Sequence, residues 1–342
     1  MTHGTCVAHI AAGDGNYSDG KYKGMAPKSK IVMVSVYIPT QHSRSTGMSN
    51  VLDAIKYVFN YADRVSMPAV VNLSLGNHFG PHDGTSLFEK GLENIIGPGR
   101  IVVAAAGNSG DTRAHIKYEF TQSDDAFSTQ IEYLQNQGSY QGYVDIWGDE
   151  NNDFSVAYCL KYNGSLHCTE YYSTTLNKTV YEYVNSPNYD QSICNMYLEN
   201  STNYNNKPRV LLEIKHNAPQ YESFIKVKGD DGTVNLWNCG AGGSTAADLN
   251  SDFSINKSIR GDTDMGISGA GANSEIVITA GAYTTREEYQ ATAGNIVRDN
   301  FYNHTGELAA FSSKGPTADD RTKPDISAPG TFILAALNSN HE

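Results

Sequence analysis

Three short apolar runs constrain the fold of this chain more than any other feature. They span residues 31–36, 69–74 and 101–106. Runs of four to eight apolar residues without alternation are typical of strands that are buried on both faces of a parallel sheet. Apolar residues at helical spacing follow in residues 51–59 and 87–96, between the runs. The pattern predicts an α/β fold in which helices flank a parallel sheet.

The character of the sequence changes near residue 112 and changes back near residue 262. Between these points tyrosine and asparagine are frequent, and short alternating stretches such as residues 143–147 and 210–214 replace the apolar runs. This pattern predicts an inserted antiparallel β-sandwich. We therefore expect three parts: the first part of an α/β core at 1–111, a β-rich insertion at 112–261 and the second part of the core at 262–342.

Charge and hydropathy exclude two classes of partner. The formal net charge is −12, and the lysines and arginines are scattered and form no basic stripe, so we predict no nucleic-acid partner. No apolar run reaches the roughly 18 residues needed to cross a bilayer. The first residues also lack the basic-then-apolar pattern of a signal peptide. We predict neither a membrane segment nor a signal peptide in these residues.

The cysteines predict reduced or partly paired thiols. Cys159 and Cys168 flank the turn sequence Asn163-Gly164, an arrangement that suits a disulfide across a hairpin. A chain of this size does not need a complete disulfide framework, so we favour reduced or partly paired thiols. No CxxC spacing occurs, and we predict no metal site. The remaining cysteines are Cys6, Cys194 and Cys239.

His3 opens a stretch of small residues that predicts a tightly packed helix. An imidazole at the start of such a helix, held beside a sheet, can act as a general base near neutral pH. Taken alone, a histidine followed by glycine is more often a turn or core residue.

Asn108 follows the third apolar run and can direct its side-chain amide toward a developing oxyanion. The alternative is an asparagine that only caps or turns the chain. The segment Ser74-Leu75-Gly76 ends the second run and leaves its backbone available to an extended peptide. Its alternative is an ordinary strand end.

In this order the three segments resemble those of the subtilisin-like serine peptidases, the subtilases. Residues 24–27, 311–316 and 325–330 also resemble family segments, and the resemblance covers about residues 1–111 and 262–342. It implies a serine endopeptidase with His3 as general base and Asn108 as oxyanion donor. The implied substrate-binding residues are Ser74, Leu75 and Gly76 along the peptide and Ala105, Ala106 and Gly107 in the wall of the specificity pocket.

The resemblance also implies partners and location. The substrate would be an extended peptide or protein, the location extracellular or in the cell envelope, and no cofactor would be required for the chemistry. Many subtilases carry structural calcium, but we assign no site because carboxylate-rich loops are usually only solvated. The loop carboxylates considered are Asp14, Asp19, Asp319 and Asp320.

The chain departs from the family pattern in its other two catalytic motifs. Neither the D-[ST]-G aspartate motif nor the GTSMA serine motif occurs in the 342 residues, and Ser339 lacks the flanks of a nucleophile. We expect an internal fragment that is inactive on its own. His9 stands where the family has glycine. The alternative is a non-catalytic pseudopeptidase, or a regulatory protein that binds peptide or carbohydrate.

The inserted region resembles the jelly-roll-like insertions of some bacterial subtilases. Its tyrosines suit the core of a sandwich, and the alternative for them is a carbohydrate or peptide platform on the surface.

Overall fold

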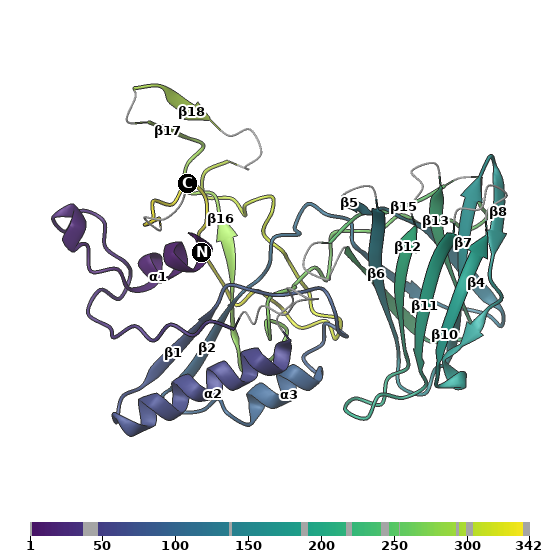
Figure 1. Cartoon of the computed structure of the whole chain (residues 1–342), viewed down its shortest axis with the longest axis horizontal. Helices are drawn as coiled ribbons and strands as arrows, with labels where there is room; N and C mark the ends of the chain where they lie inside the picture. Colours follow the sequence, from purple (N-terminus) through teal and green to yellow (C-terminus); the bar gives the residue numbers. More distant parts are fainter. Residues whose placement is uncertain are drawn as a thin grey trace.

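The chain combines a parallel sheet with two antiparallel sheets, which lie beside each other in Figure 1. The structure is a computed structural model. It describes residues 2–36, 47–136, 139–185, 191–216, 221–240, 246–252, 254–291, 294–298 and 304–337.

The parallel sheet has the strand order β1-β2-β16-β19. Its strands are β1 (Ala69–Leu73), β2 (Arg100–Ala105), β16 (Ile278–Tyr283) and β19 (Ile326–Pro329), and all neighbouring pairs are parallel. The first two strands precede the β-rich region in sequence and the last two follow it. The predicted α/β class with a parallel sheet is therefore confirmed.

Two helices cover one face of this sheet. They are α2 (Met48–Arg64) and α3 (Leu87–Glu93), and α3 begins with a capping box between Ser86 and Glu89. Apolar residues at helical spacing in α2 pack against alternate residues of β1 and β2, because residues of one strand face are two apart. This core includes Val51, Ile55, Phe59, Leu73, Leu92, Val102 and Ala104.

The opposite face of the sheet is exposed, so the prediction that both faces are covered is wrong for the described residues. Val70 pairs with Ile101, and their side chains are 65% and 41% exposed. Ile278 and Ile326 continue this face at 43% and 58% exposure. The apolar runs are continuous as expected, but no described helix lies against this side.

The run at 31–36 is not a strand, which corrects the third strand prediction. These residues have no regular structure, and Met33 is 64% exposed. A strand requires a neighbour for its backbone hydrogen bonds. Within the described residues no strand of the parallel sheet pairs with this segment.

The remaining short elements lie near the chain ends or outside the sheets. They are α1 (Thr2–Ala12), the 3-10 helices η1 (Asn16–Ser18) and η2 (Thr174–Leu176), and a hairpin of β17 (Glu288–Gln290) and β18 (Ile296–Arg298). None of the α1 side chains that the structure describes is fully buried. The expectation of a tightly packed helix is therefore wrong, because α1 lacks a covering layer.

The β-rich region forms two antiparallel sheets. The larger has the order β10-β11-β12-β6-β14-β3, with β5 beside β6, and the smaller has the order β15-β4-β13-β7-β8, with β9 beside β7. The larger contains β3 (His115–Glu119), β5 (Leu134–Asn136), β6 (Ser139–Gly148), β10 (Thr179–Asn185), β11 (Gln191–Glu199), β12 (Arg209–His216) and β14 (Thr233–Gly240). The smaller contains β4 (Asp125–Ile131), β7 (Phe154–Tyr162), β8 (Ser165–Cys168), β9 (Tyr172–Ser173), β13 (Glu222–Gly229) and β15 (Leu249–Asn250).

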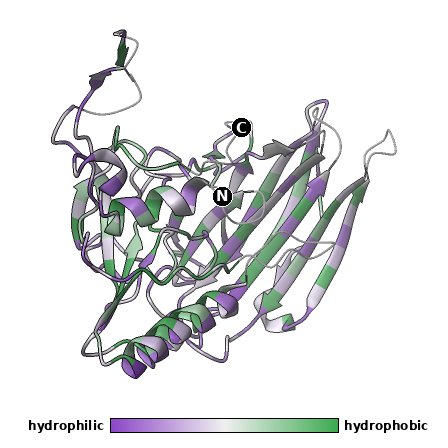
Figure 2. Cartoon of the chain, turned by 60° about the vertical axis from the view of Figure 1, so that its left-hand side comes forward, coloured by the Kyte–Doolittle hydropathy of each residue, from purple (hydrophilic) through white to green (hydrophobic). Residues whose placement is uncertain are grey.

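The two antiparallel sheets share one apolar core. Ile146, Met196 and Leu212 from the larger sheet and Val156 and Ile225 from the smaller one belong to the same buried cluster. Figure 2 shows the alternation of hydrophobic and hydrophilic residues along these strands. The expected antiparallel sheets are present.

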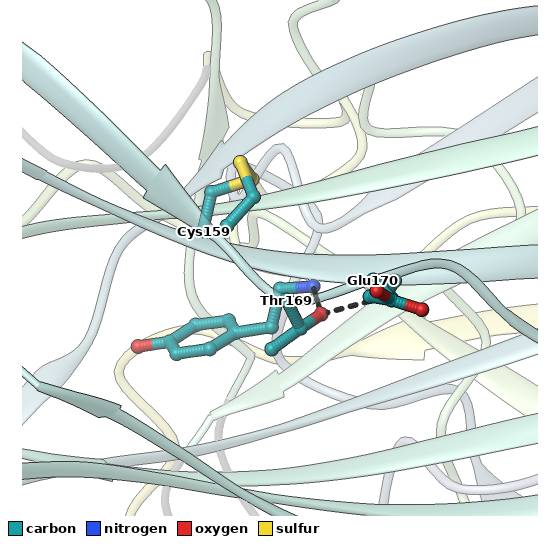
Figure 3. Close-up of a disulfide and its surroundings, with 5 residues drawn as sticks. Cys159, Thr169 and Glu170 are labelled. Atoms are coloured by element: carbon teal, nitrogen blue, oxygen red, sulfur yellow. Dashed lines mark hydrogen bonds between the residues drawn. A yellow bond between two sulfur atoms is a disulfide. The ribbon is translucent and has the colours of Figure 1, made fainter.

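One disulfide closes the β7–β8 hairpin. Cys159 and Cys168 are directly opposite each other and are bonded, and the adjoining Thr169 hydroxyl donates to the carbonyl of Glu170 (Figure 3). Asn163 and Gly164 both have positive φ, at 47° and 77°, as a two-residue hairpin turn requires. The other cysteines, Cys6, Cys194 and Cys239, are free thiols. The expectation of reduced or partly paired thiols, and not a complete disulfide framework, is confirmed.

Candidate active site

The turn after β2 presents Asn108 to solvent. Gly107 has φ +115°, and a Cβ at this position would lie 2.2 Å from the Ser268 hydroxyl, so only glycine is accommodated. The Ser313 N–H donates to the Gly107 carbonyl at 3.0 Å, and the Ser313 hydroxyl accepts from the Ser109 N–H at 3.0 Å. Asn108 itself is exposed. The turn is therefore fixed on both sides of an accessible amide.

The segment after β1 leaves one pair of main-chain groups free. Gly76 lies opposite Gly269 in an isolated antiparallel bridge. The hydrogen bonds flank this pair: Asn77 N–H donates to Ser268 O and Ala270 N–H donates to Leu75 O, each at 2.9 Å. In such a pair the central residue directs its own N–H and C=O to the other edge. Within the described part of the chain, these two groups of Gly76 have no partner.

Residues 268–270 also hold the two predicted substrate segments together. Ser268 and Ala270 form the hydrogen bonds with residues 75–77 described above. The Ser268 N–H also donates to the Ala106 carbonyl at 2.9 Å. A Cβ at Gly269 would lie 1.7 Å from the Ala105 carbonyl oxygen. Glycine at this position permits the backbones to approach. Ser74-Leu75-Gly76 and Ala105-Ala106-Gly107 are thereby brought together.

A histidine and serine pair at this site was not predicted from the sequence. The Nε2 atom of His78 lies 3.0 Å from the Ser109 hydroxyl, and both residues are buried. Burial, with a smaller contribution from His82, lowers the pKa of His78 from 6.5 to about 3. His78 is therefore neutral near pH 7. The only sequence signal was the spacing of His78 and His82 directly after the Ser74–Gly76 segment.

A buried aromatic contact joins this region to the antiparallel sheets. The His82 ring stacks on Trp237 with centroids 4.2 Å apart, and His82 Nε2 donates to the His78 carbonyl at 3.1 Å. Burial lowers the pKa of His82. The Cys239 thiol donates to the same His78 carbonyl. Strand β14 thus supports the loop that follows Gly76.

His3 lies at the exposed start of α1. No hydrogen bond or ion pair joins it to Asn108 or to residues 74–76 in the part of the chain that the structure describes. The helix is attached to the C-terminal segment through the Cys6 thiol, which donates to the Ala336 carbonyl at 3.2 Å.

His9 packs against the backbone at the end of α1. A Cβ at Gly13 would lie 2.4 Å from the His9 ring, so the imidazole occupies the space that a side chain there would need. Its Nδ1 atom is buried and has no partner among the described residues.

Of the carboxylates considered for calcium, Asp14, Asp319 and Asp320 make contacts within the chain. Asp14 accepts from the Asn16 N–H at 3.0 Å, and Asp319 pairs with Arg321 at 2.6 Å. In the described residues, no three His, Cys, Asp or Glu side chains are grouped to hold a metal ion, and no described helix is long and apolar enough to span a bilayer. Ser339 lies outside the described residues.

Comparison with known proteins agrees with the motif order. The sequence model of the subtilase family matches residues 1–192 and 241–341. The chain is 34% identical over 146 residues to a thermophilic serine proteinase of Bacillus sp. (strain AK1), covering 42% of this chain. It is 31% identical over 145 residues, also 42% of the chain, to thermitase of Thermoactinomyces vulgaris.

A solved structure, the CspB protease of Clostridium perfringens, matches with a TM-score of 0.71 over 99% of this chain. The sequence identity is 21%, so this likeness establishes the fold. The chain spans 65% of that protein's chain, 33% of the Bacillus proteinase and 47% of thermitase. It therefore covers less than two thirds of each relative.

Proposed function

The chain belongs to the subtilase family, and from this membership we propose that it provides the peptide-binding cleft of a serine endopeptidase. His3 is the general base in this proposal, and Asn108 donates its amide N–H to the oxyanion of the tetrahedral intermediate. Ser74, Leu75 and Gly76 pair with the substrate backbone. Ala105, Ala106 and Gly107 form the wall of the specificity pocket.

The N–H and C=O of Gly76, which have no partner among the described residues, carry this proposal. A fixed donor and acceptor on one extended residue match the acceptor and donor of one residue in an extended peptide. The tight contact with Gly269 fixes their direction before a peptide arrives, which reduces the entropic cost of binding. The exposed Asn108 follows the neighbouring strand of the sheet.

The proposal assigns binding, but not efficient cleavage, to these 342 residues. They contain neither the aspartate nor the serine motif of the family, and a base without a nucleophile cannot form the acyl-enzyme. No cofactor is needed for the proposed chemistry, and structural calcium stays unassigned. The Cys159–Cys168 disulfide favours an extracellular or cell-envelope location. Residues 112–261 form a jelly-roll-like insertion in this proposal.

Peptides modified along their backbone test the proposal without altering the protein. Fluorescein-labelled alanine octapeptides carry an N-methyl group at each amide in turn, which removes one hydrogen-bond donor. We expect one position at which methylation lowers affinity about fivefold or more, since one net hydrogen bond is lost. Fluorescence anisotropy measures the affinities. Absence of binding by all peptides, or equal binding by all of them, would contradict the proposal.

A non-catalytic peptide-binding protein is the second candidate. His9, which stands at a family glycine position, favours it. Translation of the coding sequence on both sides separates the candidates: in-frame aspartate and serine motifs support the endopeptidase, whereas flanking stop codons support the binding protein.

Carbohydrate binding by the insertion has one favourable observation. Tyr181 and Tyr183 on edge strand β10 are 65% and 57% exposed. A glycan array probed with the full chain and with Tyr181→Ala tests this activity. Signals that are absent, or unchanged in the variant, would exclude these tyrosines as a binding platform.

A further inference from the structure

A polar cavity of about 300 Å³ lies on the smaller antiparallel sheet. Strand β4 contributes Ser128 and strand β13 contributes Lys226, and the two residues are directly opposite each other in the antiparallel pair. Residues in this relation share one face of a sheet. Ile225 and Val227, on either side of Lys226, belong to the apolar core that the two sheets share. The cavity therefore lies on the outer face, away from that core.

Two segments beside these strands form the walls of the cavity. Asn256 and Lys257 lie along β4, where the Ser128 N–H donates to the Lys257 carbonyl at 3.0 Å. Tyr171 directly precedes β9 and is 40% exposed. Asp124, which precedes β4, contributes to the rim. None of the lining residues belongs to the candidate peptide cleft, so this site does not depend on the proposed endopeptidase function.

The hydroxyl of Ser128 is an unsatisfied polar group in the wall of this cavity. Ser128 is 2% exposed, and its side-chain oxygen has no hydrogen-bond partner among the described residues. Buried hydroxyl groups are normally paired, because an unpaired one has lost its contact with water without compensation. A ligand in the cavity that accepts a hydrogen bond would supply the missing partner.

The lysines around the cavity outnumber the carboxylates that pair with them. Lys257 pairs with Asp125, and Lys228 pairs with Asp124 at 2.7 Å. The side chain of Lys226 is partly buried and forms no ion pair or hydrogen bond with the described residues. Removing a charge from water without a counter-charge is unfavourable. An anion bound in the cavity would therefore neutralise the one lysine of this group that lacks a carboxylate.

We propose that this cavity binds an acidic monosaccharide unit, whose carboxylate accepts from the Lys226 ammonium and the Ser128 hydroxyl. Both groups are donors, and the two oxygens of a carboxylate accept several hydrogen bonds at once. The exposed ring of Tyr171 offers a flat apolar surface to the C–H face of the sugar. Asn256 and Asp124 supply an amide and a carboxylate for the sugar hydroxyl groups.

The size of the cavity agrees with one sugar ring. A volume of about 300 Å³ is at the lower end of the roughly 300–1,000 Å³ typical of small-molecule sites. The site is also separate from the exposed Tyr181 and Tyr183, because their strand β10 belongs to the larger sheet. The proposal therefore gives the β-rich region a binding site of its own.

Matched glycosides test the proposal on the full chain. The methyl glycosides of glucuronate and galacturonate are compared with those of glucose and galactose, which carry CH2OH in place of the carboxylate. Saturation-transfer NMR titrations measure the affinities. We expect one acidic glycoside to bind about tenfold or more tightly than its neutral counterpart, because a hydrogen bond to a charged group is lost with the neutral sugar. Acetate, the carboxylate alone, should bind more weakly than this glycoside.

Substitutions assign the preference to the cavity. Lys226→Met keeps most of the aliphatic stem and should reduce the advantage of the acidic glycoside to less than about twofold. Lys215→Met is its control, because Lys215 is exposed on the larger sheet. Tyr171→Ala should weaken the acidic and the neutral glycoside alike, and Tyr181→Ala should change neither.

Ser128→Ala provides a second, independent measurement. It should weaken the acidic glycoside about fivefold, because one donor to the carboxylate is lost. Urea unfolding without ligand should show no loss of stability, since the hydroxyl that is removed has no partner in the free chain.

Three outcomes would overturn the proposal. The first is that no glycoside binds, and the second is that acetate binds as tightly as the best acidic glycoside, which would indicate a site for simple anions. The third is an advantage of the acidic glycoside that persists in both Lys226→Met and Ser128→Ala. Each of these results would leave the proposed endopeptidase function untouched.

Discussion

The imidazole Nε2 of His78 lies 3.0 Å from the hydroxyl of Ser109, and this contact joins the loop after Gly76 to the turn that carries Asn108. The two loops follow neighbouring parallel strands. A change at His78 is therefore expected to affect both the stability of the fold and the geometry of the candidate cleft.

The first prediction concerns pH. Because the pKa of His78 is about 3 in the folded chain and 6.5 in the unfolded chain, only the unfolded chain binds this proton between these values. The contribution of His78 to the free energy of unfolding is complete above pH 6.5, the pKa of this histidine in the unfolded chain. As pH falls from there toward 3, the free energy of unfolding decreases by about 1.4 kcal/mol per pH unit. Burial also lowers the pKa of His82, so His82 likewise makes the free energy of unfolding decrease as pH falls.

Urea unfolding at about pH 7.5, 6.5 and 5.5 measures this dependence. His78→Gln removes the titration while it keeps a polar partner for Ser109, so its stability should fall less steeply below pH 6.5. His304→Gln is the control because the side chain of His304 is 85% exposed. Equal slopes for the wild-type chain and His78→Gln would disprove the assignment.

The second prediction concerns the turn before Asn108. Gly107→Ala should lower the free energy of unfolding by about 3 kcal/mol, since φ +115° is strained for alanine and its Cβ would meet Ser268. Gly97→Ala is the control, as no heavy atom lies within 4 Å of its added Cβ. Chemical denaturation compares the two, and similar small losses would refute the prediction.

The third prediction concerns the ion pair between Arg209 and the buried Asp145. The Asp145 side chain is fully buried, so Arg209→Met leaves an uncompensated charge and should cost about 3–5 kcal/mol. The same substitution at Arg298, whose pair with Glu288 is exposed, should cost less than about 1 kcal/mol. Comparable effects in urea titrations would argue against the ion pair as a determinant of stability.

The fourth prediction concerns the β7–β8 hairpin. Replacing both Cys159 and Cys168 by alanine should destabilise the chain by about 2 kcal/mol, because the closed loop is short. Dithiothreitol should lower the stability of the wild-type chain to that of the double variant and leave the variant unchanged. A wild-type chain that is insensitive to reduction would contradict the disulfide.

The fifth prediction concerns the uncovered face of the parallel sheet. We expect this exposed apolar face to promote self-association of the chain. Val70→Thr should reduce that association with little loss of stability, because Val70 is 65% exposed. Val102→Thr on the buried face of β2 should cost about 1–3 kcal/mol. Sedimentation velocity and urea unfolding measure the two effects, and unchanged association in Val70→Thr would exclude this face as the contact.

Local sequence patterns correctly predicted those strands that pair with a neighbouring strand. The apolar runs at 69–74 and 101–106 became β1 and β2, and the change of character near residue 112 anticipated the antiparallel sheets. The run at 31–36 is also apolar, but it pairs with no strand of the parallel sheet within the described residues, and it is not a strand. Composition reports the tendency of a segment, whereas a strand also depends on a partner elsewhere in the chain.

The candidate site was only partly predictable for a similar reason. The segments at 74–76 and 105–108 carry recognisable local patterns. The contacts that position them come from Ser268 and Gly269, and Trp237 of the antiparallel sheets stacks on His82 in the loop after Gly76. These residues are adjacent only after the antiparallel sheets pack against the loop that follows Gly76.

The strand order β1-β2-β16-β19 has a consequence for synthesis on the ribosome. Strand β2 pairs with β16, although the whole β-rich region is translated between them. The antiparallel sheets can complete their pairing before β16, the next strand of the parallel sheet, has been synthesised. During this interval the emerging α/β half exposes an unpaired strand edge, which is open to pairing with another chain.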